Sequence, residues 1–144
     1  MTTEDFDDLP IPFRAVAAEI GTGVPVVLDS GSLATAIRAS MSIPGAVPPV
    51  EIEGRRLVDG GIAANLPIEI AQGLGATRII AVDISSPLLA EGQQFETFTS
   101  IFSHLNSLLT VRNRDRDVAR LDEDDLLIVP NLGDISFVSF DRLQ

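Results

Sequence analysis

The chain has 144 residues, of which 21 are acidic and ten are basic, so its formal charge is −11. This length suits one domain with one core, and an apolar fraction of 45% excludes a largely disordered chain. Nucleic acid is a poor partner for a surface of this charge. No cysteine is present, so disulfides and thiolate metal sites are excluded. With no apolar run near the ~18 residues of a membrane span and no signal peptide, we expect a cytoplasmic protein, at most peripheral to a membrane.

The first elements are predicted to be a hairpin and a short helix. Residues 1–9 are polar and acidic, and we expect a flexible start there. Residues 13–20 and 24–28 read as two strands, joined by a glycine-containing turn. Residues 33–40 have apolar positions at helical spacing behind several residues that can cap a helix.

A second predicted hairpin leads to an acidic residue and two glycines. Residues 50–53 alternate in polarity, Gly54 turns the chain, and residues 55–58 return to Asp59. We expect Asn65 to cap the next helix, with a proline in its first turn.

The remaining elements are expected to be two strands flanking a long helix. Residues 78–82 form a continuous apolar run before Asp83, typical of a strand buried on both faces of a parallel sheet. Asp83 itself is interpreted as a cap for the following loop, with a place beside the site as the alternative. A loop then covers residues 84–94, and residues 126–129 predict the last strand. Between them, one helical face carries Phe98, Ile101, Phe102, Leu105, Leu108 and Leu109.

Two features of this last part admit more than one interpretation. The apolar helix face is expected to pack on the chain's own core, although a lid, a lipid-touching surface or a dimer contact uses the same pattern. The acidic run 122–125 lacks the ligand spacing and the turn glycine of a calcium loop, so we expect a solvated connection.

Asp59 is the strongest candidate for chemistry. Carboxyl ends of strands are where open α/β sheets bind ligands, and the glycines at 60 and 61 permit a close approach of a substrate. We interpret Asp59 as a general base; the alternative is a turn aspartate that only caps backbone N–H groups. The single histidine, His104, lies far from Asp59 in sequence, which argues against a Ser-His-Asp triad within the chain.

Several blocks together resemble the C-terminal part of a patatin-like phospholipase domain of the bacterial branch. They occur in the family's order and spacing: Pro12–Ala17, Leu28–Leu33, Arg38–Gly45, Leu57–Gly61 with Asn65–Pro67, and Ile80–Asp83. The resemblance implies an α/β fold, namely part of a three-layer α/β/α sandwich with a mixed, mostly parallel sheet. It divides the chain into a flexible start (1–9), a motif-bearing core (10–85), and a C-terminal helix, strand and tail (95–144).

The same resemblance implies hydrolysis of lipid or phospholipid acyl esters by a Ser-Asp dyad. The Asp of the family's Asp-Gly-Gly motif, which takes the proton from the serine, corresponds to Asp59. Gly60, Gly61, Ser42 and Pro44 are expected beside the site. This chemistry requires no metal and no organic cofactor.

The chain departs from the family pattern at the nucleophile. No serine here has glycine two residues before and two residues after it, and the glycine-rich oxyanion loop is also absent. Ser40 and Ser42 are therefore poor candidates for a nucleophile. We expect a domain truncated on its N-terminal side, inactive alone, that self-associates or pairs with a missing N-terminal half. The alternatives are a non-catalytic interaction module of the same descent and an unrelated α/β domain that binds a small ligand.

Overall fold

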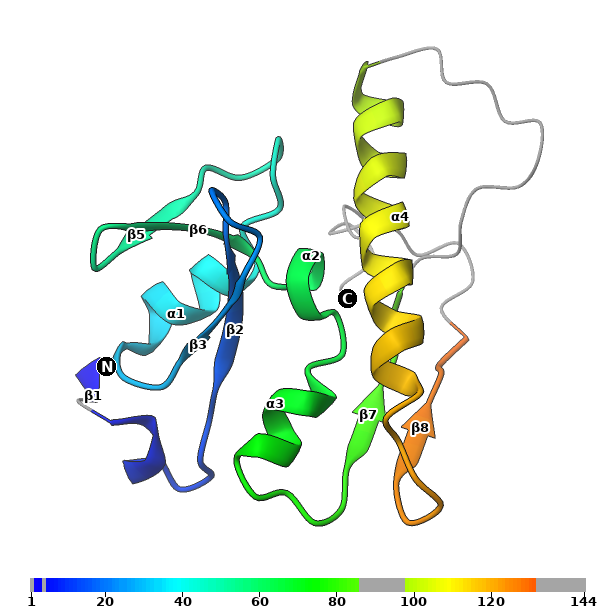
Figure 1. Ribbon diagram of the computed structural model, residues 1–144. Coiled ribbons are helices and arrows are strands. Elements are labelled where there is room, and N and C mark those ends of the chain that lie inside the picture. Colours follow the sequence, from blue (N-terminus) through cyan, green and yellow to red (C-terminus); the bar gives the residue numbers. More distant parts are fainter. Residues whose placement is uncertain (1, 4, 86–97, 132–144) are drawn as a thin grey trace, which may run out of the picture.

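The computed structural model describes residues 2–3, 5–85 and 98–131. Figure 1 shows two parts on either side of a short helix, α2 (Gly61–Ala64). One part is a four-stranded sheet with helix α1 (Leu33–Ser40), and the other is a strand pair at one end of the long helix α4 (Phe98–Val118). None of the described helices combines the length and the hydropathy that crossing a bilayer requires.

The four-stranded sheet has the order β3-β2-β6-β5, and each pair in it is antiparallel. Its strands are β2 (Ala15–Glu19), β3 (Pro25–Leu28), β5 (Val50–Ile52) and β6 (Arg55–Asp59). The first four residues of β2 are all buried, as suits an inner strand that is covered on both faces. Both predicted hairpins, β2–β3 and β5–β6, are confirmed.

The turn between β5 and β6 fixes the register of the strand that carries Asp59. Ile52 pairs with Arg55, so Glu53 and Gly54 are the two central residues of the hairpin loop. Both have positive φ, 52° and 75°, as a turn that matches the twist of the strands requires. Glycine adopts this conformation without strain, whereas a glutamate is uncommon there.

Helix α1 packs its small residues against the sheet. The side chain of Ser32 accepts a hydrogen bond from the backbone N–H of Thr35 and so caps the helix, as its sequence predicts. Ala36 and Ala39 are buried, and their short side chains let the helix lie close to the strands.

The start of the chain is packed, which differs from the flexible start that its composition predicts. Strand β1 (Thr2–Thr3) pairs with β4 (Gly31–Ser32), and a 3-10 helix, η1 (Phe6–Asp8), follows. Phe6 is fully buried in a cluster with Ala15 and Ala36. One aromatic residue within an acidic segment is enough to anchor it, because burying a phenylalanine contributes about 2 kcal/mol.

The second part packs around a separate apolar cluster. It contains α3 (Ile68–Gly73), β7 (Ile80–Val82) and β8 (Leu126–Ile128), together with the C-terminal end of α4. Its buried members are Leu66, Ile68, Ile79 and Ala81, with Ala71, Val118, Leu121 and Leu127 packed against them.

The α/β fold of the patatin type is confirmed, but the expected pattern of mostly parallel pairing does not hold for the described strands. Only β7 and β8 pair in parallel there, whereas the four-stranded sheet and the β1–β4 pair are antiparallel. The tight turns that close the two hairpins allow only antiparallel neighbours, since a parallel pair needs a long crossover. The antiparallel β2–β6 and β1–β4 pairs depend instead on how the intervening chain returns.

Strand β7 is covered on one face only, which corrects the expectation of a strand buried on both faces. Ala81 is buried, but Ile80 and Val82 are 65% and 51% exposed. Their partners across the parallel pair, Leu126 and Ile128, are also exposed. The apolar run in the sequence therefore identified the strand. It could not show how many of its faces are covered, and in the described chain nothing packs on the second face.

Helix α4 confirms the long helix predicted from the sequence, but the described side chains of its predicted apolar face are largely exposed. Ile101, Leu105 and Leu109 are exposed, and Leu108 is half-buried. The side chains of Phe98 and Phe102 lie outside the described residues, as do most of the predicted loop 84–94 and the tail after residue 131. The docked part of α4 is its C-terminal half, which combines polar contacts with the apolar contact of Val118.

Candidate functional site

Asp59 is held in place through its backbone. It is the last residue of β6, where it pairs with Ala17 of β2, and its N–H donates a hydrogen bond to the carbonyl of Ser42 over 2.9 Å. Its carboxylate oxygen Oδ1 accepts a hydrogen bond from the N–H of Gly61 at 2.7 Å. The strand and the turn together fix where this carboxylate lies.

The surroundings of Asp59 favour its protonated form. Partial burial raises the pKa of this carboxyl above its ordinary value, and the hydrogen bond from the Gly61 N–H only partly offsets that rise. Within the described part of the chain, no cationic side chain pairs with it. A carboxylate with one hydrogen bond and a raised pKa retains the capacity to accept a proton.

Of the two glycines after Asp59, Gly60 is required by space and Gly61 lies in a tight environment. A Cβ on Gly60 would lie 2.1 Å from the carbonyl oxygen of Val16, so the chain can pass β2 here only without a side chain. A Cβ on Gly61 would lie 3.0 Å from carboxylate oxygen Oδ1 of Asp59 and 3.0 Å from Oδ1 of Asn65. Glycine at both positions therefore allows the tight approach that presents the carboxylate.

Ser42 lies beside Asp59, but its hydroxyl is engaged elsewhere. The side chain is fully buried, and Oγ donates to the carbonyl of Arg38 at 2.7 Å. Its contact with Asp59 is through its backbone carbonyl. Pro44, half-buried, lies two residues further along the loop after α1, and no hydrogen bond links it to Asp59 among the described residues.

Ser40 also serves the backbone. Its hydroxyl donates to the carbonyl of Val16 at 2.7 Å, and its own carbonyl accepts the N–H of Gly60 at 3.2 Å. Ser40 and Ser42 thus tie the end of α1 to the turn after β6. Neither hydroxyl contacts the carboxylate of Asp59, so neither is arranged as a nucleophile paired with this base.

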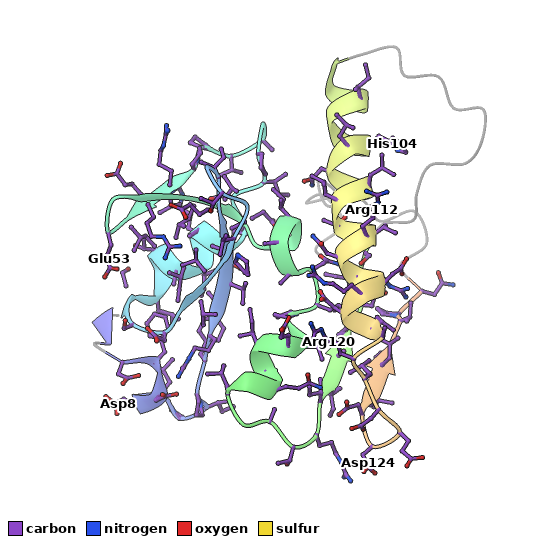
Figure 2. All side chains as sticks on the ribbon, viewed as in Figure 1. Asp8, Glu53, His104, Arg112, Arg120 and Asp124 are labelled. Atoms are coloured by element: carbon purple, nitrogen blue, oxygen red, sulfur yellow. The ribbon has the colours of Figure 1, made fainter. Side chains whose placement is uncertain are left out.

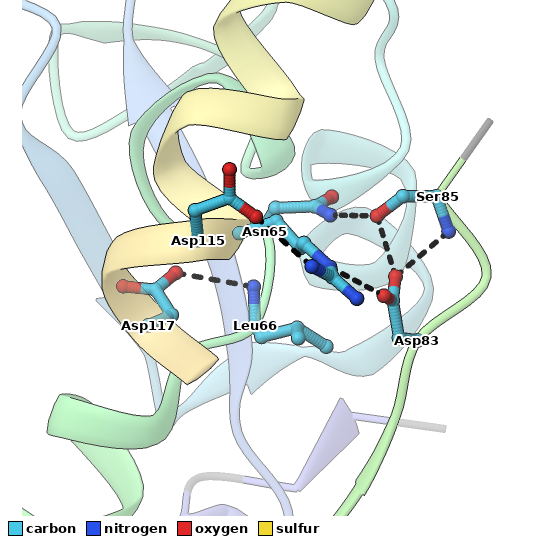
Figure 3. A network of polar contacts seen from close by, with 7 residues as sticks. Asn65, Leu66, Asp83, Ser85, Asp115 and Asp117 are labelled. Atoms are coloured by element: carbon cyan, nitrogen blue, oxygen red, sulfur yellow. Dashed lines mark hydrogen bonds and ion pairs between the residues drawn. The ribbon is translucent and has the colours of Figure 1, made fainter. Parts of the chain in front are cut away.

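Asp83, at the end of β7, belongs to a saturated polar network (Figure 3). Its Oδ1 accepts from the N–H and the hydroxyl of Ser85, and its Oδ2 pairs with Nε of Arg114 at 2.6 Å. Burial acts to raise the pKa of Asp83, but these hydrogen bonds and the Arg114 charge outweigh it and lower the pKa. The interpretation of Asp83 as a cap for the following loop is confirmed.

Asn65 extends this network, which corrects its predicted role as a helix cap. It lies at the C-terminal end of α2, and its side-chain amide donates to the hydroxyl of Ser85 at 2.7 Å. The next helix, α3, has no side-chain cap. Asn65 therefore connects the segment after Asp59 to the end of β7.

The sequence interpretation missed residues of α4 that contact the segment after Asp59. The amide of Asn113 donates to the carbonyls of Gly61 and Ile62, and the guanidinium of Arg116 donates to the carbonyl of Ala63 at 3.1 Å. A helical stripe of polar residues was visible in the sequence at 110, 113, 114 and 117, and this spacing was the available signal for Asn113 but not for Arg116, which lies outside the stripe.

The other acidic candidates do not assemble a metal site in the described residues. No group of three or more potential ligand side chains comes together in that part of the chain. In the run 122–125, the carboxylate of Asp125 accepts the N–H groups of Ile79 and Asp122, and Asp122 accepts the N–H of Asp124. These carboxylates order a turn and join it to the residue before β7, which confirms the predicted connection.

Comparison with known proteins identifies the family. The model of the patatin-like phospholipase family matches residues 1–72, half of this chain, including Asp59, Gly60 and Gly61. An uncharacterized NTE family protein of Mycobacterium tuberculosis is 44% identical over 79 residues, or 55% of this chain and 22% of that protein.

Mammalian proteins are similar over the same length. Patatin-like phospholipase domain-containing protein 7 of Mus musculus is 39% identical over 82 residues, and patatin-like phospholipase domain-containing protein 6 of Homo sapiens is 38% identical over 85 residues. These stretches are 56% and 58% of this chain but only 6% of each mammalian protein. The chain thus spans a small share of the relatives that it matches, and it belongs to the patatin-like phospholipase family, a family of lipid hydrolases.

Proposed function

We propose that Asp59 is the general base of a serine-dependent hydrolase of lipid acyl esters, of the phospholipase A or lysophospholipase type. The observation that carries the proposal is the carboxylate itself. It ends a strand, faces no cation in the described chain, accepts one hydrogen bond there, and has a raised pKa. Family membership supplies the class of substrate.

The proposed reaction uses Asp59 twice. A serine hydroxyl attacks the acyl carbonyl carbon of the lipid while its proton passes to the carboxylate of Asp59, and the proton then leaves with the alcohol of the substrate. Water then attacks the acyl-enzyme and gives a proton to Asp59, which passes that proton to the serine oxygen as the fatty acid leaves. The raised pKa of Asp59 strengthens it as a base for both steps.

The nucleophile of this reaction is proposed to come from outside these 144 residues. No serine in the sequence stands between glycines at −2 and +2, and the hydroxyls of Ser40 and Ser42 donate to main-chain carbonyls. We therefore expect this chain to be inactive when tested alone, because the loss of a nucleophile lowers the rate by about 10⁶-fold.

Two measurements test the proposal. A fluorophosphonate probe read by intact mass, with a nitrophenyl ester assay, is expected to show neither an adduct nor turnover for the isolated chain. The chain is then joined to the nucleophile-bearing segment of a patatin-like phospholipase. There, Asp59→Asn is expected to abolish turnover, while the exposed control Asp124→Asn retains it (Figure 2). Turnover by the Asp59→Asn protein, or a stoichiometric adduct on the isolated chain, contradicts the proposal.

A second candidate function is a non-catalytic interaction module of the same descent. The observation that favours it is the outer face of the β7–β8 pair, where Ile80, Val82, Leu126 and Ile128 are exposed together. Such a face supports self-association or pairing with the rest of a patatin domain. Sedimentation at rising concentration tests self-association, and a strictly monomeric chain contradicts it. The alternative of an unrelated ligand-binding domain is withdrawn, since the family is established.

A further inference from the structure

Helix α4 presents a polar stripe toward the segment that follows Asp59. Thr110, Asn113, Arg114 and Asp117 are spaced three and four residues apart, so they share one face of the helix. We call these four residues the polar stripe. They lie beyond residue 72, where the family match ends. The contacts of the stripe therefore concern a part of the chain to which the family match assigns no role.

Asn113 satisfies carbonyls that α2 cannot satisfy itself. Helix α2 has four residues, and the last four carbonyls of any helix lack partners within it. The side-chain amide of Asn113 donates to the carbonyl of Ile62 and, at 3.5 Å, to that of Gly61. The methyl group of Thr110 lies 3.4 Å from where a Cβ on Gly61 would be, so the helix also abuts this residue.

Two further side chains of α4 bind the backbone between Ala63 and Leu66. Arg116 Nη2 donates to the carbonyl of Ala63 at 3.1 Å, and Asp117, which is buried, accepts the N–H of Leu66 at 3.3 Å. Arg116 also pairs with Asp117 at 3.3 Å. The helix therefore contacts the backbone from Gly61 to Leu66 through side chains on successive turns.

The helix is also anchored to the end of β7. Arg114 pairs with Asp83 at the end of β7, and Asp83 is tied to Ser85, which accepts the amide of Asn65 (Figure 3). These bonds fix α4 relative to the strand that precedes it. A fixed helix can hold the segment after Asp59 at one position.

The hydrogen bond that fixes the carboxylate of Asp59 depends on this arrangement. Gly61 supplies the N–H that Asp59 accepts, and Asn113 donates to the carbonyl of the next residue, Ile62, and at 3.5 Å to that of Gly61. We propose that Asn113 is a positioning residue, which holds Gly61 so that Gly61 orients the general base. This inference rests on the proposed function only for its catalytic consequence; the positioning itself is a property of the isolated chain.

Amide hydrogen exchange measured by NMR on the isolated chain tests the positioning. Asn113→Ala is expected to speed exchange of the Gly61 N–H about tenfold, while the amides of β2 keep their wild-type rates. The matched control is Arg112→Ala on the same helix, which changes an exposed neighbour and is expected to leave Gly61 unchanged (Figure 2). An unchanged Gly61 rate, or a rise shared equally by β2, overturns the proposal.

A second variant covers the case in which Asn113→Ala does not fold. Asn113→Asp keeps the size of the side chain but removes its donors, so Gly61 exchange is expected to rise at least as much. In the joined enzyme described above, either variant is expected to lower kcat about tenfold at an unchanged KM. An unchanged kcat with faster Gly61 exchange overturns the positioning role. Turnover in Asp59→Asn instead refutes the proposed function, while the exchange result still decides whether Asn113 holds Gly61.

Discussion

An aspartate lies at the end of each of the strands β6 and β7, and the surroundings of the two aspartates shift their pKa values in opposite directions. Asp59 is half-buried, accepts one hydrogen bond from Gly61 within the described chain, and has a raised pKa because burial dominates. Asp83 is 4% exposed, pairs with Arg114 and accepts two hydrogen bonds from Ser85, and these contacts lower its pKa.

The difference shows that the position of an acid at a strand end does not by itself indicate chemistry. An ionised carboxylate offers about four sites for hydrogen bonds. Asp83 uses most of its hydrogen-bond sites to join β7 to α4, so its role is structural. Within the described residues, Asp59 uses only one of these sites, and a proton acceptor needs such capacity. The predictions below change one side of this comparison at a time.

The largest effect on stability is expected at Gly60, which allows the chain after Asp59 to pass close to β2. Gly60→Ala places a Cβ 2.1 Å from the carbonyl oxygen of Val16, so either β2 or the turn must shift. We expect a loss of about 3 kcal/mol or more in the free energy of unfolding, measured in urea. Gly73→Ala is the control, because a Cβ there meets nothing within 4 Å. A Gly60→Ala protein as stable as the wild type contradicts the close approach.

Removal of the Asp83 carboxylate is expected to lower stability by less than Gly60→Ala does. Asp83→Ala leaves Arg114 without its buried partner and should lower the unfolding free energy by about 2 kcal/mol at neutral pH. Since the pKa of Asp83 is lowered in the folded state, this stability is present above its ordinary pKa of 3.8 and is lost as the pH falls through the folded value.

The matched control for Asp83→Ala is a second aspartate that pairs with the same arginine, Arg114. Asp115 pairs with Arg114 at 2.9 Å but is 64% exposed, so Asp115→Ala should change stability by less than about 0.5 kcal/mol. Equal losses from the two variants would mean that burial does not distinguish these ion pairs.

Removal of the Asp59 charge should change stability in the opposite direction to removal of the Asp83 carboxylate. Because the pKa of Asp59 is raised in the folded state, ionisation above its ordinary pKa of 3.8 disfavours folding. Asp59→Asn should therefore raise stability at pH 7, by about 1 kcal/mol or less, and the gain should vanish below pH 3.8. Denaturation curves across this range measure it. A destabilised Asp59→Asn protein at pH 7 would place Asp59 with Asp83 as a structural residue.

The smallest effect is expected beside Asp83, on the uncovered face of β7. Val82 is 51% exposed, so Val82→Thr should change the unfolding free energy of the monomer by less than about 0.5 kcal/mol. Thermal unfolding at low protein concentration measures this. A loss above 1 kcal/mol would show that another surface covers the face in solution.

Local features were the ones that the sequence could predict. Gly54 and the alternation around it identified the β5–β6 hairpin, and the apolar run that stops at two glycines placed Asp59 at a strand end. These features depend on neighbours within a few residues. The resemblance of ordered blocks then supplied the α/β class and the family.

Features that depend on distant partners could not be predicted. Asn113 and Gly61 are 52 residues apart, and Leu66 and Asp117 are 51 apart, so no local pattern connects them. Asn65 had the residue type of a helix cap, but a hydroxyl 20 residues away took its amide. Antiparallel pairing between β2 and β6 likewise depends on how the intervening chain returns.

The contacts of α4 have a consequence for which residues can be replaced around Asp59. Asn113, Arg116 and Asp117 bind main-chain carbonyls and an N–H group of residues 61–66, and not the side chains of that segment. Residues such as Ile62 and Ala63 can therefore change their side chains without losing these bonds. The position of the base and the side chains around it are thereby separable, so substitutions at Ile62 and Ala63 could change the surroundings of Asp59 while leaving its position unchanged.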